Sequence, residues 1–365
     1  MRTVLHTESS PGLGGQEVRT LTEARWIAER GWRVLLAGQP GAAFTERARQ
    51  LGIGVVEVPM RGAWDLRAVG RLVRLVRDEG VGLVHTHSSV DGWVGGLAGR
   101  IARVPVVRTR HVSIRIRGRL NPVYRWLADR VITSGEAIRS IVIASGVPAA
   151  RVVAVPAGVD LAEMDRAGKA PDALRRSLGL ARPVIGSVAM FRGSKGHAHL
   201  LDAFAMVRER WPTARLLLVG DGIRRPWVEG LARERGLGDA VVFTGFRSDV
   251  PDLLRIMDCF VLASTRTEGV PQSLLQAFAA RVPAVASSVG GIPEVVTDKE
   301  TGILVAPEDA AALARGIEAV LDDPAGAAER AAAARRLVEE RFSHSASVGR
   351  LLEIYESLLL RRGDA

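Results

Sequence analysis

Short apolar stretches alternate with longer amphipathic stretches along the first half of the chain. The apolar stretches are rich in Val and Leu, which is typical of strands buried on both faces of a sheet. The stretches between them carry apolar residues at helical spacing. We expect strands at 3–7, 33–38, 54–59, 83–87, 104–109, 130–135 and 151–156, and helices at 16–30, 65–79, 90–102, 120–129 and 136–145. This alternation predicts a parallel sheet with helices on both faces.

The same alternation begins again in the second half. Residues 157–183 are polar with Gly and Pro, and they predict a linker followed by one helix. Further strands are expected at 184–190, 215–220, 240–245, 259–264, 283–288 and 302–306, with helices throughout from 308 onward. The predicted fold class is therefore α/β, with two doubly wound, Rossmann-like domains facing each other across a cleft.

Length and composition agree with this picture. A chain of 365 residues fits about two domains of roughly 150 residues. A hydrophobic content of 47% and a charged content of 25% are typical of a soluble globular protein. The apolar runs are short and the N-terminus predicts a strand rather than a signal peptide, so we expect a cytoplasmic protein. The single cysteine, Cys259, excludes a disulfide framework and is expected to be a buried structural thiol.

The formal net charge is +10, and its densest basic segment is residues 108–130. This segment holds seven arginines together with Tyr124 and Trp126. A solvated basic face is the first interpretation of this segment, and binding to an anionic membrane surface or an acidic acceptor is the second. Nucleic acid is not expected as a partner, because zinc-finger spacing, a basic zipper and an RNA-binding aromatic signature are all missing from the sequence.

Candidate ligand-binding residues lie where predicted strands end, which is where doubly wound sheets bind ligands. The glycine loop around Gly14 and Gly15 would let the backbone approach an anion at a helix N-terminus. It does not match the dinucleotide fingerprint, since Glu17 stands where a third glycine is required. Arg192 and Lys195 precede another predicted helix, and two cations at a helix N-terminus fit a diphosphate.

The stretch "TEGVPQSLLQAFAA" combines an acid with a helix start. Glu268 can accept hydrogen bonds from hydroxyl groups, and Pro271 suits the first turn of a helix. The backbone at Gly269 and Val270 would lie at that helix entrance, where N–H groups can bind sugar hydroxyls or phosphate. Gln276 in the same helix can hydrogen-bond a ribose but supplies no charge.

The motif string "FRGSKGH…VGDG…TEGVPQSLLQAFAARVPAVASSVGGIPEVV" resembles the C-terminal domain of retaining nucleotide-sugar glycosyltransferases of GT-B family 4 (glycosyl transferases group 1). The segments "GLGGQE", "HTHSS" and "PAGVD" resemble that family's N-terminal domain and hinge. The resemblance covers essentially the whole chain. It implies an acceptor-binding domain over 1–160 with a C-terminal helix, about 343–365, that crosses back to it. It also implies a donor-binding domain over 161–342.

The resemblance also implies roles for individual residues. Arg192 and Lys195 would hold the donor diphosphate and stabilise the leaving nucleotide. Glu268 would contact the transferred sugar, and His87 would face the donor sugar and the acceptor. These four are the expected catalytic residues, while His111 is expected at the acceptor. The implied donor contacts are Gly14, Gly15, Gly186, Gly222, Phe246, Arg247, Gly269, Val270, Pro271 and Gln276.

The sequence departs from the family pattern at two places. Gln276 replaces the second acid of the family's paired-Glu motif, which predicts weaker ribose binding with chemistry retained. Ala157 stands where the family usually has Asn.

We expect no metal or other cofactor. The chain contains no Asp-x-Asp triplet. His85 and His87 alternate along a predicted strand, so they are expected to point to opposite faces and not to share an ion. A UDP-sugar is the favoured donor.

The resulting hypothesis is a retaining, metal-independent glycosyltransferase that uses a nucleoside-diphosphate sugar. Its acceptor would be lipid-linked or a cell-surface lipopolysaccharide or polysaccharide, reached from the inner face of the cell membrane. The family mechanism implied is same-face attack, with the donor phosphate taking the acceptor proton. Two alternatives remain: a nucleotide-sugar epimerase of the same fold, and a nucleotide-sugar-binding scaffold whose activity lapsed with Gln276.

Overall fold

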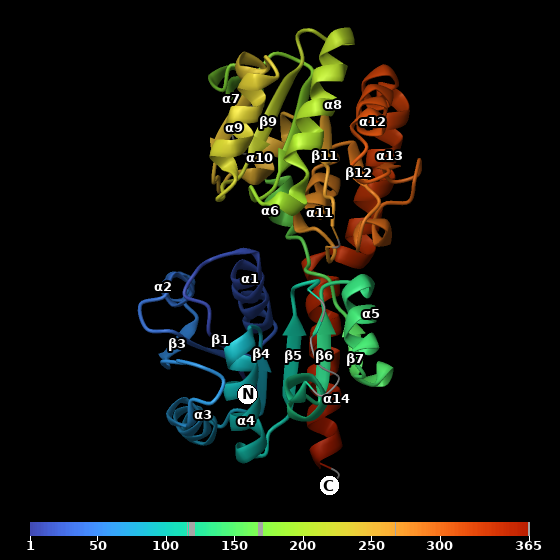
Figure 1. The fold of residues 1–365 in the computed structure, drawn as a ribbon. Coiled ribbons are helices and arrows are strands. Elements are labelled where there is room, and N and C mark those ends of the chain that lie inside the picture. The colour runs from blue at the N-terminus through green and yellow to red at the C-terminus, as the bar shows by residue number, and fades with distance from the viewer. Residues whose placement is uncertain (115, 117–120, 167–170, 267, 364–365) are drawn as a thin grey trace. The chain divides into compact units, whose positions relative to one another are not determined.

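The computed structural model describes residues 1–114, 116, 121–166, 171–266 and 268–363. The chain divides into two compact units, each built around its own parallel sheet (Figure 1). The first unit comprises Met1–Ala157 and Ser345–Ala365, and the second comprises Gly158–His344. The predicted alternation of strands and helices thus produces two separate sheets.

The first unit contains a seven-stranded parallel sheet in the order β3-β2-β1-β4-β5-β6-β7. Its strands are β1 (Thr3–Glu8), β2 (Arg33–Gly38), β3 (Gly54–Glu57), β4 (Leu83–Thr86), β5 (Val106–Arg110), β6 (Arg130–Thr133) and β7 (Val152–Ala154). Its helices are α1 (Gly15–Glu29), α2 (Ala43–Gln50), α3 (Leu66–Asp78), α4 (Ser89–Ala102), α5 (Glu136–Ala144) and α14 (His344–Gly363), with a π-helical turn at Val123–Leu127 and a 3-10 turn at Ala149–Arg151.

Helix α3 shows how local sequence builds this unit. Asp65 caps its N-terminus by accepting a hydrogen bond from the Ala68 backbone N–H at 3.0 Å, a cap that typically stabilises a helix by about 1 kcal/mol. Its buried residues are Ala68, Val69, Leu72, Val73 and Val76, which recur at helical spacing on one face. That face packs into the apolar core on one side of the sheet.

Two elements of the first unit differ from the sequence prediction. Helix α2 was not expected, because its sequence is mostly polar and only Phe44, Thr45 and Ala48 are buried. The helix expected at 120–129 is reduced to the π-helical turn Val123–Leu127, while residues 117–120 lie outside the described part of the chain.

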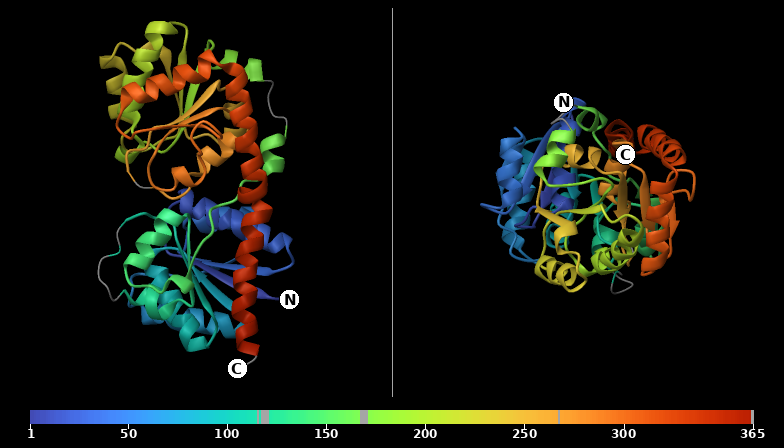
Figure 2. Two further views of the ribbon diagram at one scale, coloured as in Figure 1. Left: turned by 90° about the vertical axis from the view of Figure 1, so that its right-hand side faces the viewer. Right: turned by 90° about the horizontal axis from the view of Figure 1, so that it is seen from above.

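Helix α14 returns the end of the chain to the first unit. The residues Val348, Leu351, Tyr355 and Leu358 are buried and form one stripe at helical spacing. Tyr355 is fully buried, with its ring 5.6 Å from the Trp32 ring. The left view of Figure 2 shows this red helix running along the sheet of the first unit.

The second unit contains a six-stranded parallel sheet in the order β10-β9-β8-β11-β12-β13. Its strands are β8 (Val184–Val188), β9 (Arg215–Val219), β10 (Val241–Gly245), β11 (Cys259–Leu262), β12 (Ala284–Ser287) and β13 (Ile303–Val305). Its helices are α6 (Leu161–Asp165), α7 (Pro171–Ser177), α8 (His197–Arg210), α9 (Arg225–Glu234), α10 (Val250–Arg255), α11 (Gln272–Ala279), α12 (Ala310–Asp322) and α13 (Pro324–Leu337), followed by a π-helical turn at Val338–Phe342. The described residues of the segment 157–183 form two short helices, α6 and α7, where one was expected.

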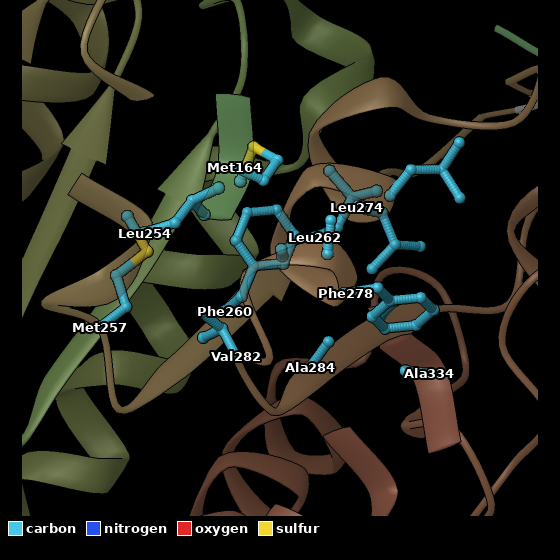
Figure 3. Packing of buried hydrophobic residues seen from close by; sticks show 14 of the residues in the cluster. Met164, Leu254, Met257, Phe260, Leu262, Leu274, Phe278, Val282, Ala284 and Ala334 are labelled. Atoms are coloured by element: carbon cyan, nitrogen blue, oxygen red, sulfur yellow. The ribbon is translucent and has the colours of Figure 1, made fainter. Parts of the chain in front are cut away.

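The second unit has apolar residues on both faces of its sheet. On one face, Phe260 and Leu262 of β11 lie in a cluster with Leu274 and Phe278 of α11 (Figure 3). On the other face lies Cys259, which is fully buried as predicted. Burial raises the pKa of its thiol far above the ordinary value, so a structural role is the one this cysteine can fill.

Each sheet has one point where the strand order reverses. It lies between β1 and β4 in the first unit and between β8 and β11 in the second. Loops that leave neighbouring strands in opposite directions open a crevice at such a point, where doubly wound proteins bind ligands. Within the described residues, every helix is too short or too polar to cross a membrane.

Candidate functional site

Lys195 and Glu268 lie beyond the two strands that flank the reversal point of the second sheet. Lys195 follows β8 and Glu268 follows β11. The Lys195 Nζ donates a hydrogen bond to Glu268 Oε2 at 2.8 Å, and the two side chains are only 23% and 14% exposed. The Ser264 hydroxyl donates to the other carboxylate oxygen. The structure therefore brings the predicted lysine and glutamate together as an ion pair, and a hydrogen bond from a third side chain, Ser264, also orients the glutamate.

The loop that carries Lys195 is pressed against the chain after β11. Gly196 has φ of 65°, and a Cβ added there would lie 1.8 Å from the Ala263 carbonyl oxygen. The Thr265 backbone N–H donates to the Ser194 carbonyl at 2.9 Å. Only glycine fits this left-handed, closely packed position, so Gly196 sets where Lys195 emerges.

The Gly-Gly turn after β12 supports Glu268 from another direction. The Gly291 N–H donates to the Glu268 carbonyl at 2.9 Å. Gly290 has φ of 55°, and a Cβ there would lie 2.3 Å from the Glu268 backbone nitrogen. The two glycine motifs, one after β8 and one after β12, thus enclose the glutamate loop.

Arg192 and Gly222 occupy the loops after β8 and β9. Arg192 is exposed at the start of the 3-10 turn that contains Lys195. A Cβ on Gly222 would lie 2.7 Å from the Phe191 carbonyl oxygen, so the two loops are in close contact. The Phe191 backbone N–H donates a hydrogen bond to the Asp221 carbonyl, and the Phe191 carbonyl accepts one from the Arg224 N–H.

Phe246 and Arg247 follow β10 at the outer edge of the same sheet. The Phe246 side chain is 80% exposed. Arg247 forms two hydrogen bonds to the Asp249 carboxylate, at 2.7 and 2.5 Å, which raise the pKa of the guanidinium. Its guanidinium is therefore already oriented by an acid of its own loop.

The remaining predicted donor residues lie just before α11, within α11 or in the sheet. Val270 is buried, and Pro271 precedes α11 rather than occupying its first turn. Gln276 is half-buried within that helix. Gly186 lies inside β8, where a Cβ would be 2.1 Å from the Met257 sulfur. Core packing accounts for this glycine without a ligand.

Glu8 ends β1 at the reversal point of the first sheet. It is fully buried and accepts hydrogen bonds from the Ser10 N–H at 2.9 Å and the Gln16 side-chain amide at 2.6 Å. Burial, followed by the nearby charge of Asp91, raises the pKa of Glu8 to about 7. The reversal point therefore contains a carboxyl group that titrates near neutral pH.

Asp91 ties the loop after β4 to the end of β1. Its carboxylate accepts hydrogen bonds from the His87 and Ser88 backbone N–H groups, each at 2.7 Å, and from the Thr7 hydroxyl at 3.0 Å. Asp91 is fully buried, and burial raises its pKa, although Arg108 at 4.0 Å opposes that shift. This network fixes the backbone that carries His87.

The glycine loop after β1 leaves space beside the helix start. The Gly14 N–H donates to the Glu17 carboxylate at 2.7 Å. Glu17, which broke the dinucleotide fingerprint, thus caps α1. Among the described residues, apart from its chain neighbours and the backbone of its own helix, no heavy atom lies within 4 Å of where a Gly15 Cβ would be. This side of Gly15, the first residue of α1, is therefore open to an approaching group.

The histidines of the first unit form one cluster, which corrects a prediction. His85 and His87 were expected to point to opposite faces, but their ring centroids are 4.2 Å apart. The reason is that β4 ends at Thr86, so His87 no longer follows the strand pleat. Nitrogens of His6, His85 and His87 lie within 4.8 Å of one another, so the spacing does not exclude a shared ion.

His87 and His111 differ in exposure. His87 is buried, with its Nε2 2.9 Å from His6 Nδ1 and its Nδ1 3.3 Å from His111 Nε2. His111 is half-buried after β5. Burial lowers the pKa of both rings well below the ordinary value, and Arg108 adds to the shift, so both are neutral at pH 7. His111 is the one of these two rings with a surface left for a ligand.

The basic segment 108–130 is only partly a surface. Arg108 and Tyr124 are 5% and 4% exposed and belong to the core of the first unit. Arg110 donates to the Tyr124 hydroxyl at 2.8 Å, whereas Trp126 is 57% exposed. Residues 115 and 117–120 lie outside the described part of the chain. The description of 108–130 as one solvated basic face is therefore wrong for Arg108 and Tyr124.

Sequence reasoning missed Glu8, Asp91 and His6. The pattern Ser88-x-x-Asp91 is a capping-box signature, and it could have located Asp91 at the start of α4. The position of Glu8 at a predicted strand end was a signal of the same kind as that used for His87. No local signal points to Tyr355, which meets this cluster only through the tertiary fold.

The raised pKa of Glu8 makes a stability prediction. The pKa of Glu8 rises from 4.5 in the unfolded chain to about 7 in the folded protein, so protonated Glu8 stabilises the fold. This contribution to the free energy of unfolding is fully present below about pH 4.5 and is lost as the pH rises through about 7. Compared with Glu8→Gln, the wild type should lose about 3 kcal/mol of unfolding free energy between about pH 5 and about pH 8. Urea denaturation at both pH values measures this difference. The exposed Glu353→Gln serves as control, and an equal response in both variants would contradict the burial argument.

Known proteins resemble this chain over nearly its full length. The family model described as Glycosyltransferase Family 4 matches residues 13–163, and the model described as Glycosyl transferases group 1 matches residues 172–337. A 2-deoxystreptamine glucosyltransferase from Streptomyces kanamyceticus is 30% identical over 94% of this chain and 99% of its own. A UDP-Gal:alpha-D-GlcNAc-diphosphoundecaprenol alpha-1,3-galactosyltransferase from Escherichia coli is 28% identical over 71% of each chain.

Solved structures agree with the fold. Anabaena Alr3699/HepE in complex with UDP and glucose has a TM-score of 0.88 at 25% identity, covering 98% of this chain and 100% of that one. A glycosyltransferase from Rickettsia africae also reaches a TM-score of 0.88, at 22% identity over 98% of both chains. The predicted α/β class, with two Rossmann-like domains of the GT-B type, is confirmed by these likenesses and by the two sheets.

Proposed function

The chain belongs to glycosyltransferase family 4, and we propose that it transfers a sugar from a UDP-sugar to a hydroxyl group with retention of configuration and without a metal ion. The observation that carries this proposal is the Lys195–Glu268 pair at the reversal point of the second sheet. An ammonium group has three donors, so Lys195 can bind Glu268 and a phosphate oxygen together.

The second unit, as the proposed donor-binding domain, would stabilise the leaving group. The bond between the sugar C1 and the diphosphate oxygen breaks, and negative charge develops on the nucleotide. Lys195 and the exposed Arg192 follow the same strand and supply positive charge there. Glu268, oriented by Ser264 and Lys195, would accept hydrogen bonds from sugar hydroxyls.

Retention would follow from attack on the face that the nucleotide leaves. The acceptor oxygen forms the new bond to C1, and its proton passes to the departing phosphate oxygen. Glu268 is already engaged by two donors, which favours a binding role over that of a nucleophile. Contacts to the diphosphate or the acceptor would come from Gly14, Gly15 and His111 of the first unit. His87 would influence the bound substrate through its hydrogen bond to His111.

The acceptor we propose is lipid-linked or a surface polysaccharide. The Escherichia coli relative is named for a diphosphoundecaprenol acceptor, and Trp126 supplies an exposed aromatic within the basic segment for contact with an anionic membrane. The Streptomyces kanamyceticus relative instead carries the name of a 2-deoxystreptamine acceptor. An amine-bearing small acceptor is the second candidate, favoured by the name of that relative.

A nucleotide panel tests the donor proposal. UDP, GDP, ADP and dTDP are added to the protein with EDTA or with magnesium, and the melting temperature is recorded. We expect UDP to raise it equally in both conditions, because protein cations rather than a metal bind the diphosphate. Stabilisation that requires magnesium would refute metal independence, and no stabilisation by any nucleotide would refute the donor site.

Transfer assays test the reaction. A UDP-sugar is incubated with a diphosphoundecaprenol glycan or with 2-deoxystreptamine, and the anomeric coupling constant of the product is measured by NMR. We expect the product to keep the configuration of the donor. Inversion would refute retention. Conversion of the sugar without an acceptor and with its nucleotide bond intact would indicate an epimerase, and binding without turnover would indicate a scaffold.

A further inference from the structure

Four of the seven histidines lie in one continuous hydrogen-bonded chain in the first unit. It begins at Thr109, whose hydroxyl is 2.6 Å from His85 Nε2, and His85 Nδ1 is 2.6 Å from the Tyr355 hydroxyl. Tyr355 lies 3.5 Å from His6 Nε2, and His6 continues to His87 and then to His111 through the contacts of 2.9 and 3.3 Å given above. The chain thus begins within β5, passes through Tyr355 of α14 and ends at the half-buried His111 just after β5.

All four imidazoles are neutral. His6, His85 and His87 are fully buried, and burial is the main cause that lowers the pKa of every ring in the chain, to about 3 for His6. The guanidinium groups of Arg19 and Arg108 lie near the rings and disfavour a further positive charge. A neutral imidazole has one donor nitrogen and one acceptor nitrogen. The direction of one hydrogen bond therefore determines the direction of the next.

The Thr109 end selects the direction. If His85 Nε2 donated to Thr109, the threonine proton would need another acceptor, and the described residues provide none for it. If Thr109 donates to His85, the proton left without a partner among the described residues is His111 Nδ1–H, on the half-buried ring, and the fully buried Thr109 hydroxyl avoids the cost of an unsatisfied donor. His85 then donates to Tyr355, Tyr355 to His6, His6 to His87, and His87 to His111.

We propose that Thr109, His85, Tyr355, His6 and His87 are positioning residues that hold His111 as the Nδ1–H tautomer. His111 Nε2 accepts from His87, so its Nδ1–H is left to donate to an oxygen of the bound substrate. The identity of that oxygen rests on the proposed function, in which it belongs to the acceptor sugar or its hydroxyl. His111 thereby offers a neutral N–H donor. Its Nδ1 could act as a base only if every hydrogen bond in the chain reversed its direction.

Nitrogen-15 NMR of the histidine-labelled full-length protein tests the tautomers without any activity assay. We expect the Nδ1–H form for all four rings, whereas free neutral histidine favours Nε2–H. Tyr355→Phe keeps the buried ring but removes the link, and Thr109→Val removes the first donor. Either variant should return His111 to a mixture of tautomers. A wild type with Nε2–H at His111, or variants with unchanged tautomers, would overturn the proposal.

Two matched controls separate the chain from general packing. Tyr124→Phe removes a buried hydroxyl that bonds Arg110 outside the chain. Thr86→Val removes a buried hydroxyl for which the described residues offer no hydrogen-bond partner. Both should leave the histidine tautomers unchanged. A zinc titration that shifts His6, His85 and His87 together, and is reversed by EDTA, would assign these rings to an ion and also overturn the chain.

Kinetics add a readout that depends on the proposed function. Tyr355→Phe should raise the acceptor KM by about fivefold, the effect of one neutral hydrogen bond, with the donor KM unchanged. An unchanged acceptor KM together with a lost tautomer would show that the chain exists but that His111 does not donate to the acceptor, which overturns that part of the proposal. An enzyme with no transfer activity at all refutes the proposed function and leaves the NMR test standing.

Discussion

Lys195→Met is expected to lower kcat/KM for sugar transfer by about 10²–10³-fold, the usual effect of removing one group that stabilises a developing anion. Methionine keeps an unbranched side chain, one atom shorter than that of lysine, and removes the charge that faces Glu268 at 2.8 Å. Glu268 loses its ion-pair partner as well, so donor binding should weaken. Initial rates with a UDP-sugar and isothermal titration with UDP measure the two effects.

Lys299→Met is the matched control for this prediction. Lys299 is one of the few other lysines and is exposed in the turn before β13. It has φ of 63° already, and methionine adds no new backbone strain there. Its activity and UDP affinity should equal those of the wild type. If Lys195→Met and Lys299→Met behave alike, Lys195 does not bind the leaving nucleotide.

Gly196→Ala is expected to lower the free energy of unfolding by about 3 kcal/mol, from left-handed backbone strain combined with overpacking. The added Cβ would lie 1.8 Å from the Ala263 carbonyl oxygen, which is backbone and cannot rotate away. The loop must shift, and Lys195 moves with it, so transfer activity should also fall. Urea denaturation of the ligand-free protein measures the stability change.

Gly193→Ala is the control within the same loop. In the part of the chain that the structure describes, apart from its chain neighbours and the backbone of its own turn, no heavy atom lies within 4 Å of its Cβ position, and its φ is not positive. Its stability should stay within about 1 kcal/mol of the wild type, because alanine restricts only the unfolded chain at such a position. Equal destabilisation by both variants would mean that the loop is not packed against β11 as described.

The sequence led reliably to the sheets because strong local signals encode them. Buried parallel strands are short apolar runs, and the helices between them have a regular period, so both can be recognised without knowing their neighbours. Where the local signal is weak, prediction failed. Helix α2 has few apolar residues. Strand β4 ends one residue before His87, so the His87 ring lies beside that of His85 and not on the opposite face of the sheet.

By itself the sequence determined the fold class, the family, and the residue types of the proposed donor loop, including Lys195, Glu268 and the glycines beside them. Only the tertiary structure decided which of these residues meet. Lys195 and Glu268 are separated by 73 positions along the chain, and Tyr355 and His85 by 270. The physical reason is that hydrogen bonds, burial and pKa shifts depend on distances in space. The order of strands in each sheet sets those distances, and no local pattern in the sequence records that order.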